Sequence, residues 1–306
     1  MKISRLAFTF LTTLASAGLV AGPAQAGQKS EKSKETASWN FDSLGSWFEE
    51  MGEGFAEAFN GPKRTAPAFK WSGKLAAGKT FEVRGINGPI RAVASSGSEI
   101  QLVAIRTGRR SDPESVTIEV VPHSGGVTVC ALYPSRDESR PNVCKPGGGG
   151  RMNVRNNDVN VEWELQIPSD IAFEGRTVNG SIHAEVAGRA AVSTVNGSIE
   201  VDAGTLTEAT TVNGSIRAAV RDGGSSADDV KLSTVNGSVR LRLPEGLNAD
   251  VSARTVNGGI TSEFDEIEVR KKYGPRSAEG RLGKGGRELA LSTVNGGIRI
   301  SKGGDQ

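Results

Sequence analysis

The chain has 306 residues, of which 40 are glycine and 5% are aromatic. Its 37 lysines and arginines nearly balance its 35 aspartates and glutamates, which argues against binding nucleic acid or anionic membranes through bulk charge. Abundant glycine with few aromatic residues favours a protein of many tight turns over one with a large aromatic-rich catalytic core.

Residues 1–26 have the features of a secretory signal peptide. Lys2 and Arg5 precede the apolar stretch Leu6–Val20, and Ala24–Ala26 is an A-x-A cleavage site. We therefore expect an exported protein of the periplasm, cell envelope or extracellular space, whose mature chain starts at Gly27 and has no transmembrane segment. Cleavage removes two basic and no acidic residues, which leaves 35 of each.

Residues 27–67 are predicted to form a separate leader. Gly27–Ser38 is polar and flexible in composition, whereas Trp39–Asn60 has apolar residues at steps of three and four, which indicates a short amphipathic helix. The polar positions of this helix are acidic, so we expect it to dock on protein rather than on a membrane. It could cap the main domain or bind a partner. The apolar residues are Phe41, Leu44, Trp47, Phe48, Met51, Phe55 and Phe59.

The domain that follows, residues 68–302, begins with apolar and polar residues in alternation, which is typical of half-buried strands. In Val159–Ile167 every second residue is apolar, and the residues between them are polar or charged. The expected strands are Thr80–Arg84, Ile90–Ala94, Glu99–Arg106, Val116–Val121, Val127–Leu132 and Val159–Ile167.

The chain has two cysteines, Cys130 and Cys144. An exported chain meets an oxidising compartment, so the pair predicts a disulfide that encloses Ala131–Val143. A redox or metal pair fits less well, because the spacing is wider than C-x-x-C and the chain has two histidines.

From Thr177 onward the chain repeats the phrase Thr-Val-Asn-Gly followed by Ser or Gly and then Ile or Val. Successive copies of its asparagine are 17, 17, 23, 21 and 38 residues apart, and Gly85–Ile90 is a weaker earlier copy. The repeated asparagines are Asn179, Asn196, Asn213, Asn236, Asn257 and Asn295.

Two architectures can use this phrase. Asn-Gly favours a two-residue hairpin, which would build a meander or barrel, but Val195 and Ile199 would then lie on opposite faces. In a β-solenoid, Asn-Gly is a corner and each coil stacks on the one before it. We predict the solenoid, with the Val and Ile of each repeat buried and the asparagines stacked about 4.8 Å apart as an amide ladder.

The sequence resembles the bacterial putative-adhesin domain family, a domain of unknown function with tandem TVNG repeats. Leu165–Pro168, the run of TVNGSI units and the late Gly-Gly segment before the last TVNGGI carry the resemblance, which covers about residues 69–302. It implies a right-handed all-β, solenoid-like fold on exported or envelope proteins, and no established catalytic motif. Trp39–Asn60 and the cysteine loop have no counterpart in that pattern.

Candidate catalytic or metal-binding residues are few. Asp222, Asp228 and Asp229 lie in one acidic loop, but their spacing does not match an EF-hand, and a solvated loop explains them better than a calcium site. His183 has His123 as its sole histidine partner, which is too little for a metal site or a Ser-His-Asp triad. We therefore predict no catalytic, cofactor or metal site.

The outward position after each repeat's Ile or Val is partly basic. If the coils stack, these residues form a ladder that could bind an acidic cell-surface glycan or an envelope protein, or could be an ordinary solvated face. The ladder residues are His183, Glu200, Arg217, Arg240, Thr261 and Arg299.

The sequence thus predicts an exported, non-catalytic structural or adhesin-like binding protein. A carbohydrate-active enzyme on the same scaffold and an envelope stress or signalling accessory protein are the alternatives. The first would need converging carboxylates, and the second would use the Trp39–Asn60 helix.

Overall fold

The computed structural model describes residues 62–148, 150–221, 228–270 and 275–303. They belong to one structural unit, Asn60–Gln306, and the regular structure in them is strand apart from two short turns, η1 (Pro113–Ser115) and η2 (Pro146–Gly148). The expected signal peptide and the expected Trp39–Asn60 helix lie outside the described residues. Within these ranges, no helix is both long enough and apolar enough to cross a membrane.

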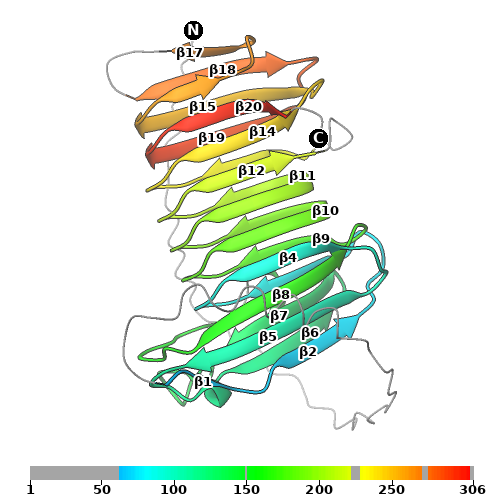
Figure 1. Cartoon of the computed structure of the whole chain (residues 1–306), viewed down its shortest axis with the longest axis vertical. Helices are drawn as coiled ribbons and strands as arrows, with labels where there is room; N and C mark the ends of the chain where they lie inside the picture. Colours follow the sequence, from blue (N-terminus) through cyan, green and yellow to red (C-terminus); the bar gives the residue numbers. More distant parts are fainter. Residues whose placement is uncertain (1–61, 149, 222–227, 271–274, 304–306) are drawn as a thin grey trace, which may run out of the picture. The chain divides into compact units, whose positions relative to one another are not determined.

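Each repeat phrase makes a corner between two strands, and we call this strand–corner–strand unit a rung. The strands before the corners form one parallel ladder and the strands after them form a second (Figure 1). The two strands of a rung do not pair with each other, so the fold is solenoid-like and not a set of hairpins. The strands are β9 (Ala172–Arg176), β10 (Ile182–Ser193), β11 (Ile199–Thr210), β12 (Ile216–Val220), β13 (Val230–Ser233), β14 (Val239–Pro244), β15 (Ala249–Asn257), β16 (Ile260–Ser262), β19 (Arg287–Asn295) and β20 (Ile298–Gly303).

The corner buries threonine and exposes valine, so the predicted burial of Val was wrong. Thr194 is 6% exposed and Ile199 is 1% exposed, whereas Val195 is 39% exposed. The bend through Val-Asn-Gly-Ser turns Thr and Ile toward the core, and the Thr194 hydroxyl donates a hydrogen bond to the Gly180 carbonyl of the neighbouring rung at 2.9 Å. Because this hydroxyl has a hydrogen-bond partner inside the core, its burial avoids the free-energy cost of an unpaired buried polar group.

The asparagine side chains form a continuous ladder. In each TVNG rung the Nδ2 atom donates to the Oδ1 atom of the preceding asparagine in the stack at 2.8 or 2.9 Å. The ladder begins at Asn87, so the phrase Gly85–Ile90 is also a corner, between β3 (Thr80–Arg84) and β4 (Ile90–Ser95). Gly85 replaces the usual threonine because a Cβ atom there would lie 3.0 Å from Nε1 of Trp163.

The rungs do not stack in sequence order, contrary to the prediction that each coil follows the last. Asn295 lies between Asn236 and Asn257, because β19 pairs with both β13 and β15 and β20 pairs with both β14 and β16. The 38-residue gap contains the hairpin β17 (Ile267–Arg270) and β18 (Arg276–Leu282), which pairs antiparallel to β15. The outer edge of β15 is therefore occupied, and the last rung fills the place left beside β13 (Figure 1).

The strands before the repeats extend both ladders. β7 (Gly126–Leu132) is parallel to β3 and β8 (Asn160–Pro168) is parallel to β4, so they form a further rung whose corner is replaced by the long loop 133–159. Antiparallel strands β1 (Arg64–Thr65), β2 (Phe69–Gly73), β5 (Ile100–Gly108) and β6 (Thr117–His123) complete this end. The six strands expected between Thr80 and Ile167 are all present, with ends within two residues.

Large side chains fill the core at this end. Trp163, Phe81 and Phe173 are at most 1% exposed, and Trp71 stacks on Phe81 with ring centroids 5.3 Å apart. A disulfide joins Cys130 on β7 to Cys144 in the long loop, with the two Cα atoms 5.9 Å apart. The loop that replaces a corner is therefore covalently attached to the ladder.

Candidate functional site

Of the three acidic residues singled out in the sequence, the two that the structure describes, Asp228 and Asp229, contact different partners. Asp228 lies 3.7 Å from Arg189, and the Asp229 carboxylate accepts a hydrogen bond from the backbone N–H of Glu288 at 2.8 Å. Asp222 lies outside the described residues. In the described part of the chain, no group of three or more His, Cys, Asp or Glu side chains could hold a metal ion.

The two histidines lie in different ladders. His183 on β10 has its Nε2 atom 3.1 Å from Glu185 and its Nδ1 atom 3.6 Å from Glu200. His123 on β6 contacts the Thr128 hydroxyl at 3.2 Å. Each ring belongs to a local surface network, and the structure does not bring the two rings together.

The outward residues after the corners do form a ladder on one face. The register pairs His183 with Glu200, Glu200 with Arg217 and Arg217 with Arg240. Arg299 follows Arg240 and precedes Thr261, because β20 lies between β14 and β16. The inserted last rung thus makes three arginines consecutive, and we call Arg217, Arg240 and Arg299 the arginine ladder.

The arginine ladder carries concentrated positive charge. Neighbouring strands are about 4.8 Å apart, so the three arginines follow each other along the backbone at roughly that spacing, and like charges directly opposite each other cost stability. Within the described ranges, Arg217 and Arg240 have no ion pair, and Arg242 adds a fourth arginine beside Arg240. Arg299 is anchored 2.7 Å from Glu263. Its hydrogen bond holds the pKa of that carboxyl below the usual value.

An acidic cluster adjoins the arginine ladder on the same face. Glu185, Glu200 and Asp202 project from β10 and β11, and Asp202 pairs with Arg221 at 2.7 Å. A shallow hollow of about 500 Å³ spans the boundary between this cluster and the arginines. The face is therefore divided into an acidic part and a basic part, and the basic part is the better candidate for binding an anion.

Sequence reasoning missed a second surface, the row of exposed valines at the corners. Each of these side chains is 38–48% exposed, and stacking places them side by side along the edge of the solenoid. The sequence contained a signal for this surface. Thr and Ile flank a four-residue bend in each repeat, and if the threonine points into the core, the valine next to it must point outward. We call this row the valine ridge; it contains Val178, Val195, Val212, Val235, Val294 and Val256.

The asparagine ladder beside this ridge uses the amides of the four N-x-S sequons. The Nδ2 atoms of Asn179, Asn196, Asn213 and Asn236 each donate to the neighbouring asparagine. Each of these nitrogens has a hydrogen-bond partner inside the ladder, so the asparagines of the sequons stabilise the stacked rungs.

Comparison with known proteins finds one family model that matches part of the chain. Residues 169–301 match the model of the Toastrack DUF4097 family, which agrees with the resemblance to a putative-adhesin domain of unknown function. No curated protein matches the chain.

Solved structures of three bacterial proteins are similar to this chain at low sequence identity. A putative cell adhesion protein from Clostridium sporogenes is 13% identical with a TM-score of 0.41, covering 78% of this chain and 100% of its own. A putative adhesin from Bacteroides fragilis is 12% identical with a TM-score of 0.34, covering 77% and 97%. A putative adhesin from Parabacteroides merdae is 8% identical with a TM-score of 0.21, covering 78% and 96%. At this distance, function has to be argued from the chain's own residues.

Proposed function

We propose that this chain, which matches the Toastrack DUF4097 family over residues 169–301, is an exported, non-catalytic, adhesin-like protein that binds acidic polysaccharide through its arginine ladder. One observation carries the proposal. Arg217, Arg240 and Arg299 stand in consecutive register on one exposed face, although Arg299 is the most distant of them in sequence.

The chemistry of the ligand follows from the geometry of the ladder. A guanidinium group can bind a carboxylate through two parallel hydrogen bonds, which lysine cannot do. The ladder repeats at about 4.8 Å, and one pyranose ring of a linear polysaccharide advances by a similar distance. A uronic acid polymer, with one carboxylate on each ring, would therefore meet successive arginines if it ran across the strands.

Two further features support an exported site of this kind. The amino-terminal 26 residues have the pattern of a cleaved signal peptide, and the Cys130–Cys144 disulfide is typical of proteins that fold in an oxidising compartment. The mature chain has no net charge, so attraction for an acidic polymer has to come from a local patch.

A binding assay with polygalacturonate and its oligomers tests the proposal, with dextran as the neutral polymer. The double variant Arg217→Gln/Arg240→Gln should bind polygalacturonate at least tenfold more weakly, and the salt dependence of binding should become less steep. Arg254→Gln is the matched control, because Arg254 is an exposed arginine on β15, in the other ladder. It should change affinity less than twofold.

Two outcomes would contradict the proposal. If Arg254→Gln weakens binding as much as the double variant, the attraction is a general charge effect and the arginine ladder is not the site. If the polymer becomes shorter during incubation with the protein, the non-catalytic assignment is wrong.

A further inference from the structure

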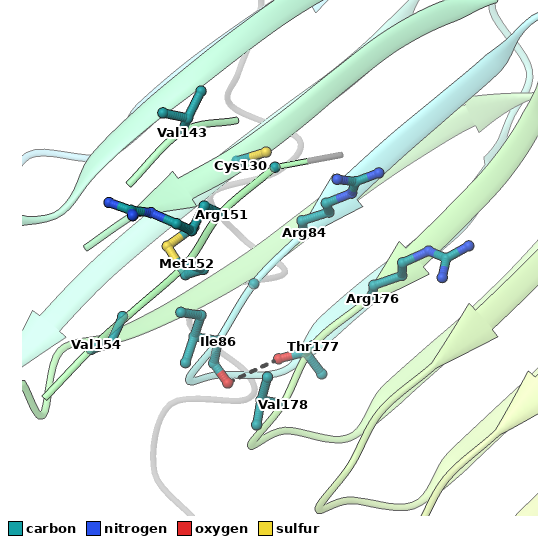
Figure 2. Close-up of a pocket in the computed structure, with 12 residues that line it drawn as sticks. Arg84, Ile86, Cys130, Val143, Arg151, Met152, Val154, Arg176, Thr177 and Val178 are labelled. Atoms are coloured by element: carbon teal, nitrogen blue, oxygen red, sulfur yellow. Dashed lines mark hydrogen bonds between the residues drawn. The ribbon is translucent and has the colours of Figure 1, made fainter. Parts of the chain in front are cut away.

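An apolar hollow lies where the valine ridge meets the long loop 133–159. Its volume is about 390 Å³, within the range of small-molecule sites. Figure 2 shows its lining residues, which come from the first corner, the next corner and the disulfide-bonded loop. The loop residues lie outside the segment that matches the family model, whereas Arg176, Thr177 and Val178 lie within it.

One side of the hollow is apolar and open to solvent. Val143 and Met152 of the loop are 37% and 36% exposed, and Val178 of the second corner is 38% exposed. Ile86 and Val154 complete this wall. Outside the valine ridge, the described chain has two large apolar side chains that are at least 36% exposed, Val143 and Met152. Both line the same hollow. Clustering of exposed apolar side chains marks a binding surface.

Three arginines line the hollow: Arg84, Arg151 and Arg176. Arg84 and Arg176 lie across from Met152 and Val154 (Figure 2). Both arginines share the buried carboxylate of Glu82, at 2.6 Å and 3.5 Å respectively. Arg176 also lies 3.4 Å from the Glu174 carboxylate, so these two arginines are matched by two acids. Arg151 lines the hollow from the loop and has no ion pair within the described ranges, so it supplies the positive charge that is left for an anion.

The disulfide holds the apolar wall in place. Cys130 itself lines the hollow, and Cys144 follows Val143 directly in the loop. Val143 and Arg151 exchange two backbone hydrogen bonds of 2.9 and 3.0 Å, so the wall is a short pair of extended segments fixed to β7 by the disulfide. Without this bond, the loop would keep fewer connections to the ladder.

We propose that this hollow binds a single-chain anionic amphiphile, such as a long-chain carboxylate. The alkyl tail packs against Ile86, Met152 and Val178 inside the hollow, while the headgroup lies beside Arg151. Each methylene that the wall buries should strengthen binding about fourfold, until the tail outgrows the apolar surface. The site is separate from the arginine ladder and does not depend on it.

Calorimetric titration of the mature protein with carboxylates from decanoate to hexadecanoate, kept below micelle formation, tests this site. Affinity should rise with tail length, and hexadecanoate should bind at least tenfold more tightly than hexadecanol or hexadecylamine. Met152→Glu should weaken hexadecanoate binding at least tenfold, because it places a negative charge in the apolar wall. Arg151→Gln should reduce the preference for carboxylate over alcohol.

Val235→Glu is the matched control, since Val235 is a similarly exposed ridge residue outside the hollow. It should change hexadecanoate affinity less than twofold. Reduction of the disulfide, with the fold checked by circular dichroism, should lower affinity at least fivefold while polygalacturonate binding stays unchanged.

Three outcomes would overturn the proposal. One is equal affinity for the carboxylate, the alcohol and the amine. Another is equal weakening by Met152→Glu and Val235→Glu, which would mean that the whole ridge binds tails without a defined site. The third is tight binding of an acidic peptide together with no binding of any carboxylate, which would make the occupant a protein segment.

Discussion

The two ends of the described unit reach a buried core by different means. In the amino-terminal region, residues 62–176, Trp163, Phe81 and Phe173 are buried and a disulfide fixes the longest loop. In the repeat region, residues 177–303, Phe264 is the one aromatic residue among those described, and the buried side chains are mostly aliphatic.

This difference follows from stacking. When each rung sits on a near copy of itself, small side chains fill the space between rungs, and the corner's threonine, asparagine and glycine find the same partner every time. In the amino-terminal region, the rung of β3 and β4 has only a weak copy of the corner, Gly85–Ile90, and the rung of β7 and β8 has none. These rungs need large side chains to reach the packing density of a native core. In the rung that lacks a corner, the disulfide fixes the loop that replaces it.

The largest expected effect removes the aromatic core of the amino-terminal region. Trp163→Ala should lower the free energy of unfolding by about 4 kcal/mol, because Trp163 is fully buried and the site cannot collapse around the cavity. Urea denaturation followed by circular dichroism measures this change. Val235→Ala, which trims an exposed side chain of the repeat region, should cost less than about 0.5 kcal/mol. Equal costs would erase the distinction between the two regions.

The next effect breaks the stacking of the repeat region. Gly214→Ala would place a Cβ atom 2.0 Å from the Gly197 carbonyl oxygen, so two backbones must separate, at a cost of about 3 kcal/mol. Gly78→Ala is the control, because that glycine has open space around it and a φ of +77°, which adds backbone strain of about 1 kcal/mol. If Gly214→Ala is the milder change in urea denaturation, close rung contact does not limit the stack.

The next effect is a loss of stability at alkaline pH that arises in the amino-terminal region. Burial raises the pKa of Tyr133 to about 12, and its hydroxyl donates to the Val159 carbonyl at 2.9 Å. Because the unfolded chain ionises near pH 10, this stability is present below that pH and is lost as the pH rises toward 12. Unfolding free energy should fall by about 2 kcal/mol between pH 9 and pH 11.5. Tyr133→Phe should remove most of that fall; the same fall in the variant would exclude Tyr133 as its source.

The smallest effect tests the asparagine ladder. Asn213 donates one amide hydrogen bond and accepts another, each 2.8 Å long, so Asn213→Ala should cost about 1 kcal/mol. Asn257 is at the end of the ladder and makes one such bond, so Asn257→Ala should cost about half as much. Denaturation curves that give the larger cost at Asn257 would mean that the ladder does not add its stability rung by rung.

Several features could be read from local sequence. Alternation of apolar and polar residues located the six strands between Thr80 and Ile167, since period two is a property of the extended chain itself. Near-identity of the TVNG phrase indicated stacked corners, because a stacked residue has its own copy as neighbour. The cysteine pair and its export context indicated the disulfide.

Side-chain direction at the corner was not predictable from hydrophobicity. Valine is more apolar than threonine, and yet Thr194 is buried and Val195 is exposed, because the threonine hydroxyl has a carbonyl partner in the next rung. A hydropathy pattern does not contain that partner. The same limit concealed the valine ridge and the hollow at its end.

The sequence by itself determined that the chain repeats a corner, where its first strands lie and which residues face outward after each corner. The tertiary structure decided the order of the rungs. The β17–β18 hairpin occupies the outer edge of β15, so the last rung is inserted beside β13 and places Arg299 next to Arg240. Each TVNG rung presents nearly the same edge to its neighbours, so local sequence cannot distinguish one stacking order from another, and the hairpin's pairing supplies the difference.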